Sequence, residues 1–184
     1  MEVVRQSLRH ARNPAIHQTS DVLLHRDVIT QALHVRHALV DQFNLADGPR
    51  PSKANVAITT EGVSPFVSAL FGSWMSGAVA VPLPPTHPDA AIEYMLRDSR
   101  PDVVLCDEAH VERMRTLHPR GRVIRIPPRE GFRFLSTSHL LGGVVESLGR
   151  DEQRWRDEDH ALILYTSGTT GRCVTETKTR GVQV

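Results

Sequence analysis

The chain alternates between short continuous apolar runs and longer stretches in which apolar residues recur at helical spacing. The clearest helical stretch steps by four, three, four and four residues, through Val28, Ala32, Val35, Leu39 and Phe43. A second helix is predicted over 64–78, with Ser64 as its N-cap and Pro65 at its first helical position. Further helices are predicted, in chain order, over 88–99, 108–117 and, less regularly, 138–148.

The apolar runs between these helices have the length and the β-branched content of strands, and they lie at 55–60, 79–83, 102–107, 122–126 and 161–166. They are continuously apolar rather than alternating, which is typical of strands buried on both faces. Strands that alternate with helices pair in parallel through right-handed crossovers. The pattern therefore predicts an α/β fold, with a mostly parallel sheet and helices on both faces.

Composition narrows the class of protein. A chain of 184 residues, 40% hydrophobic and 23% charged, is long enough for one packed domain or for a piece of a larger one. The net charge of +1 gives no overall field that favours nucleic acid. No apolar run approaches the roughly 18 residues that a membrane-spanning helix needs, so no transmembrane segment is expected. Cys106 and Cys173 are the only cysteines, which argues against a disulfide framework and for a reducing compartment.

The first 12 residues are basic, because Arg5, Arg9, His10 and Arg12 stand against the single acid Glu2. Such a stretch is compatible with an organelle-targeting peptide, although it is short and poor in serine. The alternative is a solvated first helix. Residues 1–12 are therefore expected to be an N-terminal extension or a first helix. The compartment stays open between cytoplasm and mitochondrion.

The segment TSGTTG follows the last predicted strand directly. Ligands of open α/β sheets gather at the carboxyl ends of strands, where this segment stands. Gly168 and Gly171 permit a close backbone approach, and successive N–H groups in such a turn form an anion site. Hydroxyl donors are added by Ser167, Thr169 and Thr170, with Thr166 as a fourth. This chemistry suits a polyphosphate.

Two features limit that interpretation. The segment is not a Walker A loop, because Arg172 rather than a lysine follows Gly171. A short Gly- and Thr-rich stretch is also typical of a solvent-exposed hairpin or loop with no ligand. The segment taken alone therefore leaves both a phosphate site and an ordinary hairpin open.

The longer string YTSGTTGR resembles the phosphate-binding signature of the adenylate-forming (AMP-dependent synthetase/ligase) superfamily, which includes the acyl- and aryl-CoA synthetases. The resemblance extends to other segments in the family's order: NPAI at 13–16, GSWMSGAVAVPLPPTHP at 72–88, IEYMLRDSRPDVVLCD at 92–107 and DEDHALIL at 157–164. It spans about Asn13 to Arg172, and THP at 86–88 favours the malonyl-CoA synthetase-like branch of the acyl-CoA synthetases.

The resemblance implies a fold, a reaction and a set of binding residues. Residues 13–172 would form part of the N-terminal AMP-binding domain. The family activates a small or fatty carboxylate with ATP and Mg²⁺, and the acyl-adenylate then reacts with CoA to form a thioester. By the same resemblance, the residues that orient the ATP phosphates are Thr166, Ser167, Gly168, Thr169, Thr170 and Gly171.

The chain departs from the family after Arg172. The family pattern has Pro-Lys-Gly where this chain has Cys173, Val174 and Thr175, and the next lysine is Lys178. The tail 173–184 is short, polar and unlike the helix that the resemblance implies after the loop. The adenine and acyl pockets, the metal-coordinating acid and the catalytic lysine of the family lie downstream of this point.

We therefore expect an N-terminal portion of an ATP-dependent acyl-CoA synthetase, inactive as this chain and ending in a divergent tail. The alternative is a non-catalytic truncated isoform that acts as a binding or regulatory fragment. Ten histidines also prompt a search for a metal site. His34 and His37 share a predicted helix face with His25 just before it, yet no acidic or Cys partner is near, so an exposed helix face is the simpler interpretation. A serine hydrolase is excluded, because TSGTTG lacks the G-x-S-x-G elbow.

Overall fold

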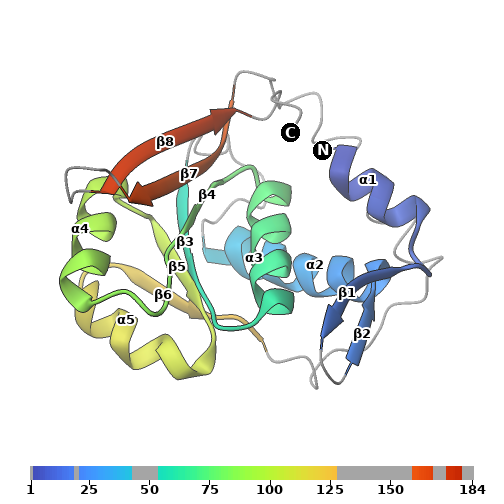
Figure 1. Cartoon of the computed structure of the whole chain (residues 1–184), viewed down its shortest axis with the longest axis horizontal. Coiled ribbons are helices and arrows are strands. Elements are labelled where there is room, and N and C mark those ends of the chain that lie inside the picture. The colour runs from blue at the N-terminus through green and yellow to red at the C-terminus, as the bar shows by residue number, and fades with distance from the viewer. Residues whose placement is uncertain (1, 19–20, 43–53, 128–158, 168–172, 180–184) are drawn as a thin grey trace.

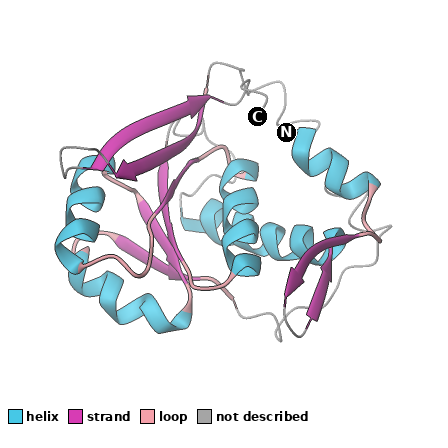
Figure 2. Cartoon of the chain, viewed as in Figure 1, coloured by secondary structure: helices cyan, strands magenta, loops and turns pink. Residues whose placement is uncertain are grey.

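The computed structural model describes residues 2–18, 21–42, 54–127, 159–167 and 173–179 of the chain. Its centre is a six-stranded sheet with helices on both faces (Figures 1 and 2). The strands of this sheet are β3 (Asn55–Thr59), β4 (Val79–Pro82), β5 (Val103–Cys106), β6 (Arg122–Arg125), β7 (His160–Ser167) and β8 (Cys173–Thr179).

Strand order in the sheet is β6-β5-β3-β4-β7-β8. Every neighbouring pair from β6 to β7 is parallel, and β8 alone is antiparallel to its neighbour β7. The α/β fold and the mostly parallel sheet are therefore confirmed, and each predicted strand from Asn55 to Thr166 is present.

The handedness of the connections decides which face each helix covers. The chain steps from β3 to β4 through α3 (Val63–Met75), then back past β3 to β5 through α4 (Asp89–Ser99). Because right-handed crossovers in opposite directions place their helices on opposite faces, α3 and α4 lie on opposite sides of the sheet. The step from β5 to β6, through η1 (Glu108–His110) and α5 (Val111–Leu117), continues in the second direction, so α5 joins α4.

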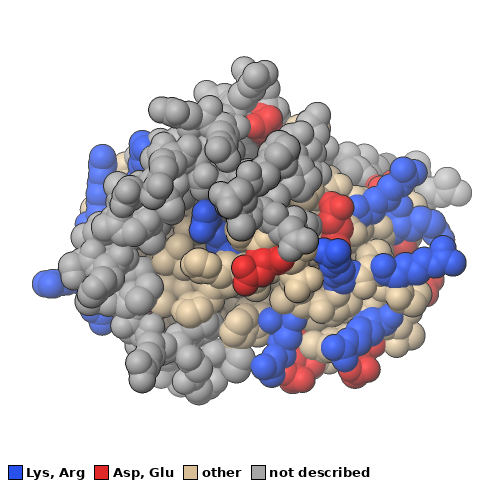
Figure 3. Space-filling model, turned by 180° about the vertical axis from the view of Figure 1, so that it is seen from behind, with Lys and Arg blue, Asp and Glu red and all other residues tan. Residues whose placement is uncertain are grey.

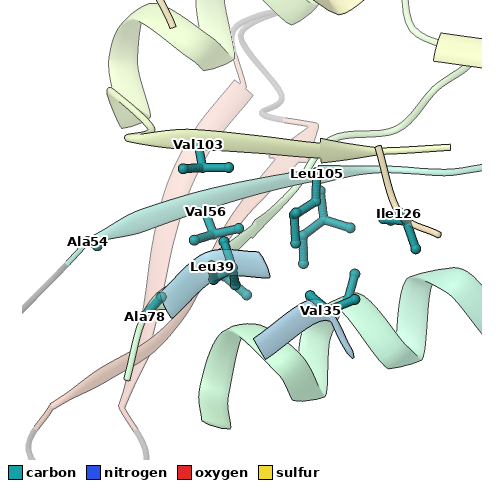
Figure 4. Close-up of a cluster of buried hydrophobic side chains, with 11 residues drawn as sticks. Val35, Leu39, Ala54, Val56, Ala78, Val103, Leu105 and Ile126 are labelled. Carbon is teal, nitrogen blue, oxygen red and sulfur yellow. The ribbon is translucent and has the colours of Figure 1, made fainter. Parts of the chain in front are cut away.

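One face of the sheet packs against α3 and α2 (His25–Gln42). In this cluster Val35 and Leu39 of α2 meet Val56 of β3 and Leu105 of β5, all at most 1% exposed (Figure 4). The other face packs against α4 and α5, where Met95 and Met114 are fully buried among side chains of the alternate strand positions. Alternate residues of each strand thus supply two separate cores, as the continuous apolar runs predicted.

The two ends of β5 are joined to β3 by aspartate side chains. Asp102 accepts a hydrogen bond from the backbone N–H of Asn55 at 2.9 Å, at the amino ends of the two strands. Asp107 accepts one from the N–H of Glu61 at 2.9 Å, just beyond their carboxyl ends. The N–H groups of Asn55 and Glu61, at the two ends of β3, thus have side-chain acceptors. These bonds fix where the pairing of the two strands begins and ends.

The contact between α2 and α3 is close and partly polar. Inside it, Ser64 and Ser68 both donate to Oε1 of Gln31, at 3.2 and 2.8 Å. The expected cap at Ser64 is wrong: α3 begins at Val63, its N-cap is Gly62 and no side chain caps it. The Ser64 hydroxyl instead donates to the side-chain oxygen of Gln31. A buried amide oxygen has no water to bond to, whereas the N–H groups at an exposed helix end do.

The N-terminal segment forms a first helix, which was one of the two expectations for residues 1–12, and a hairpin that sequence periodicity did not predict. Helix α1 (Glu2–Arg9) packs on α2, and β1 (Pro14–Gln18) pairs antiparallel with β2 (Asp21–Leu24). Val4 and Leu8 are 0% and 4% exposed, so α1 is docked by an apolar side rather than solvated all round. Of the other expected elements, the helix at 138–148 lies outside the described residues.

A substitution at Gly72 tests how closely α2 and α3 pack against each other. A Cβ at Gly72 would lie 2.7 Å from the backbone oxygen of Ala32 and from Cβ of Val35. Alanine adds about 1 kcal/mol of helix propensity, but overpacking against backbone costs about 1–3 kcal/mol. We expect Gly72→Ala to lower the free energy of unfolding by up to about 2 kcal/mol in urea titrations. Glu93→Ala, on the exposed side of α4, is the control and should change it by less than about 0.5 kcal/mol.

Two histidines of α2 predict a pH dependence of stability. Partial desolvation, together with His10 beside His25 and His37 beside His34, holds the pKa of His25 and of His34 below the ordinary value of 6.5. The unfolded chain therefore binds more protons just below pH 6.5, so stability is complete above that pH and falls as pH drops through the lowered pKa values. We expect the melting temperature to fall between about pH 7.5 and about pH 5.5. A His25→Gln/His34→Gln variant should lose less over that interval, and an equal loss would contradict the assignment.

Candidate functional site

The end of β7 lies at the edge of the sheet where the parallel strands have their carboxyl ends. Thr166 and Ser167 are the last residues of β7, and Thr166 is exposed. Because β3, β4 and β5 also end at this edge, a ligand bound there meets several loops at once. The other four predicted phosphate-binding residues, Gly168, Thr169, Thr170 and Gly171, lie outside the described residues.

Strand β8 returns antiparallel along β7, at the outer side of the sheet (Figure 1). The pairing places Cys173 opposite Ser167 and Val174 opposite Thr166. Residues 173–179 therefore form a strand, where the resemblance implied a helix. The two strands that flank the Gly- and Thr-rich segment are the arms of a hairpin.

The register also locates the lysine of the tail. Lys178 pairs with Leu162, four residues before Thr166. At about 3.3 Å per residue, its backbone is about 13 Å along the strand from the position of Thr166. Val174 is thus the residue of β8 that pairs with the end of β7. Lys178 is too far along the strand to take the place of the lysine in the family pattern.

Aromatic side chains tie β7 to the helices on both faces of the sheet. Near its amino end, the indole N–H of Trp74 in α3 donates to the backbone oxygen of Ala161 at 2.8 Å. Near its carboxyl end, the hydroxyl of Tyr165 lies 2.8 Å from Oδ2 of Asp98 in α4. The rings of Tyr165 and Tyr94 meet edge to face, with centroids 6.4 Å apart. The strand is therefore held from one face near its amino end and from the other face just before Thr166.

A single arginine organises the turn after β4, the strand next to β7. The guanidinium of Arg113 in α5 donates to the backbone oxygens of Pro85 and His87, at 2.5 and 2.6 Å, and to Oδ1 of Asp89 at 2.8 Å. A rigid fork of donors that meets three acceptors fixes the turn's position. Sequence reasoning missed this residue, since nothing in the periodicity of α5 separates Arg113 from its solvated neighbours.

A buried histidine joins the loops that follow β3 and β5. Its Nδ1 lies 2.5 Å from Oδ1 of Asp107, and its Nε2 lies 3.7 Å from Oε1 of Glu61, while His110 as a whole is 7% exposed. Nδ1 is thus hydrogen-bonded to Asp107, while Nε2 faces the carboxylate of Glu61 beyond hydrogen-bond distance. We interpret His110 as a cross-link between the two loops, and it too was missed from the sequence.

The other candidate residues do not assemble into a second site. Among the described residues, no group of three or more His, Cys, Asp or Glu side chains could hold a metal ion. His34 and His37 lie on the exposed side of α2, as the simpler interpretation predicted. Burial first, and then the negative charge of Asp107, raises the pKa of the Cys106 thiol to about 12, so this cysteine is not a nucleophile near neutral pH.

The surface charge is mixed in sign. On the face opposite to that of Figure 1, basic and acidic side chains lie next to one another among neutral residues (Figure 3). This arrangement agrees with the net charge of +1. Within the described part of the chain, no helix is long and apolar enough to cross a membrane.

Several known proteins are similar in sequence. The malonate–CoA ligase ACSF3 of Bos taurus, a mitochondrial protein, is 35% identical over 149 residues, which cover 80% of this chain and 24% of that protein. The malonate–CoA ligase of Arabidopsis thaliana is 34% identical over 131 residues, covering 65% of this chain and 19% of that protein. The chain therefore spans about a quarter or less of the length of the curated relatives it matches.

Solved structures share the fold at lower identity. The anthranilate CoA ligase AuaEII, in complex with anthranoyl-AMP, has a TM-score of 0.70 at 22% identity over 97% of this chain and 33% of its own. ATP-bound MatB from Rhodopseudomonas palustris has a TM-score of 0.67 at 20% identity over 97% of this chain and 34% of its own. The family model described as "AMP-binding enzyme" matches residues 3–173. With that match over almost all of its length, the chain belongs to the AMP-binding enzyme family, the adenylate-forming enzymes that its signature segment resembles.

Proposed function

We propose that this domain holds ATP in a ligase that activates a carboxylate as an acyl-adenylate and passes the acyl group to CoA. The observation that carries the proposal is the position of Thr166 and Ser167, at the carboxyl end of a central strand and at the mouth of a hairpin. The family match over residues 3–173 supports the same assignment. The activity belongs to the protein in which these residues meet the remaining parts of the family's catalytic machinery.

The proposed reaction follows from the chemistry of carboxylates. A carboxylate is a poor electrophile until one of its oxygens becomes part of a good leaving group. Attack on the α-phosphorus of ATP releases pyrophosphate and leaves an acyl-adenylate, from which a thiol then displaces AMP. The segment Thr166–Gly171 would bind the β- and γ-phosphates by hydroxyl and backbone N–H donors, so that the α-phosphorus faces the carboxylate.

The relatives favour a small dicarboxylate as the substrate, because those named above act on malonate. They also favour the mitochondrion among the two compartments that the sequence left open. Mg²⁺ enters this proposal as the counter-ion of the ATP phosphates. Since the described residues offer no group of three ligands for a metal, we assign none of them to it.

Direct binding of ATP tests the proposal. We expect the chain to bind ATP more tightly than AMP in calorimetric titrations, because the segment is proposed to contact the β- and γ-phosphates. Replacing two hydroxyl donors to a charged group, in Thr169→Ala/Thr170→Ala, should weaken ATP binding by about tenfold or more and leave AMP binding almost unchanged. Thr116→Ala, on the exposed side of α5, is the control. Equal affinities for ATP and AMP in the wild-type chain would contradict the assignment.

A lysine introduced at position 174 tests whether the lysine of the family pattern would strengthen ATP binding. Val174 lies opposite Thr166, so Val174→Lys adds a positive charge beside the proposed phosphate site. We expect about threefold to tenfold tighter ATP binding, with a gain that shrinks at high salt because the charge is near the surface. Thr177→Lys is the control, since it adds the same charge opposite Ile163, farther down the hairpin and on the other face of the sheet. An equal gain in both variants would show a general charge effect and would count against a phosphate site at this end of β7.

A further inference from the structure

The carboxyl end of β7 is connected to α4 by the side chain of Tyr165. Tyr165 lies on the face of the sheet that α4 covers, where it packs with Ile163 against the cluster around Met95. Its hydroxyl oxygen lies 2.8 Å from Oδ2 of Asp98 and 3.2 Å from the backbone oxygen of Met95. A phenol has one proton to donate, so the shorter, charge-assisted bond to the carboxylate is the stronger of the two.

Asp98 occupies an unfavourable position for an acid. It lies in the last turn of α4, which ends at Ser99, and the negative end of the helix dipole disfavours a carboxylate there. Helix formation therefore does not account for an aspartate at this position. In this position its carboxylate accepts a hydrogen bond from the hydroxyl of Tyr165.

The Tyr165–Asp98 contact works together with a second one at the other end of the strand. The indole of Trp74 holds Ala161, four residues earlier in β7 and from the opposite side of the sheet. Two contacts about 13 Å apart along the strand restrain it from sliding along its axis. A slide by one residue would turn every side chain of β7 to the wrong face, and it would move Thr166 away from the edge of the sheet.

We propose that Tyr165 and Asp98 are positioning residues for the nucleotide site: their hydrogen bond sets the position of the end of β7, and thereby that of Thr166 and Ser167. The inference rests on the proposed function for its nucleotide. It extends the site to α4, a helix that the phosphate-binding signature does not include. We expect the Tyr165–Asp98 hydrogen bond to affect the binding of the phosphates and not that of the adenosine.

Hydrogen exchange tests the positioning without nucleotide. Tyr165→Phe removes only the hydroxyl and keeps the ring contact with Tyr94. We expect the backbone amides of Thr166 and Ser167 to exchange about threefold to tenfold faster in this variant than in the wild-type chain, as measured by NMR. Tyr94→Phe removes a hydroxyl from the neighbouring ring and is the matched control, with unchanged exchange expected. Equal exchange in Tyr165→Phe and wild type would overturn the proposal.

Nucleotide titrations test the link to the phosphates. We expect Tyr165→Phe and Asp98→Ala each to weaken ATP binding by about threefold to tenfold, and the double variant to lose no more than either, because both remove the same bond. AMP binding should stay unchanged, and Asp98→Asn, which keeps an acceptor oxygen, should recover most of the ATP affinity. A purely structural role would instead weaken ATP and AMP alike, and that result would overturn the proposal.

The two experiments separate this inference from the proposed function. Failure of the wild-type chain to bind ATP would contradict the proposed function, while the exchange comparison would still decide whether Tyr165 and Asp98 position the strand. Faster exchange with an unchanged ATP affinity would retain the proposed function and overturn the link between this hydrogen bond and the nucleotide site.

Discussion

The burial of β3 on both faces is the constraint on which the rest of the domain depends. Val56, Ala57, Ile58 and Thr59 are at most 1% exposed, so both sides of this strand need a complete apolar layer. The right-handed connections meet that need by placing α3 on one side and α4 on the other. With the layers set in this way, the parallel strands end at one common edge, and the end of β7 joins the loops after β3, β4 and β5.

Polar side chains then hold the loops at that edge. Asp107 and His110 connect the loops after β3 and β5, Arg113 secures the turn after β4, and Tyr165 fastens the end of β7 to α4. Each of these side chains bonds to a neighbouring loop or helix rather than standing free in a pocket. Their common effect is to fix the loops after β3, β4 and β5 and the end of β7 at this edge of the sheet.

Sequence patterns predicted the central fold well, because buried parallel strands and their crossover helices leave strong periodic signals. They did not predict β1 and β2, which are short and lack clear alternation, or the start of α3, where Gly62 rather than Ser64 is the N-cap. Within the candidate site, Thr166 and Ser167 were predicted from a motif of neighbouring residues. Asp98, Arg113 and His110 were missed because their partners are 67, 24 to 28, and as many as 49 residues away along the chain.

The sequence by itself determined the order along the chain of the strands from β3 to β7 and of the helices between them, the burial of the sheet on both faces, and the family that the signature segment resembles. These properties follow from local spacing, from apolar content and from a contiguous string of residues. The tertiary structure alone decided that residues 173–179 return as a strand, that Val174 stands opposite Thr166, and that Tyr165 meets Asp98. Such pairings depend on how separate segments align in the sheet, and a linear sequence carries no direct signal for a contact that only packing creates.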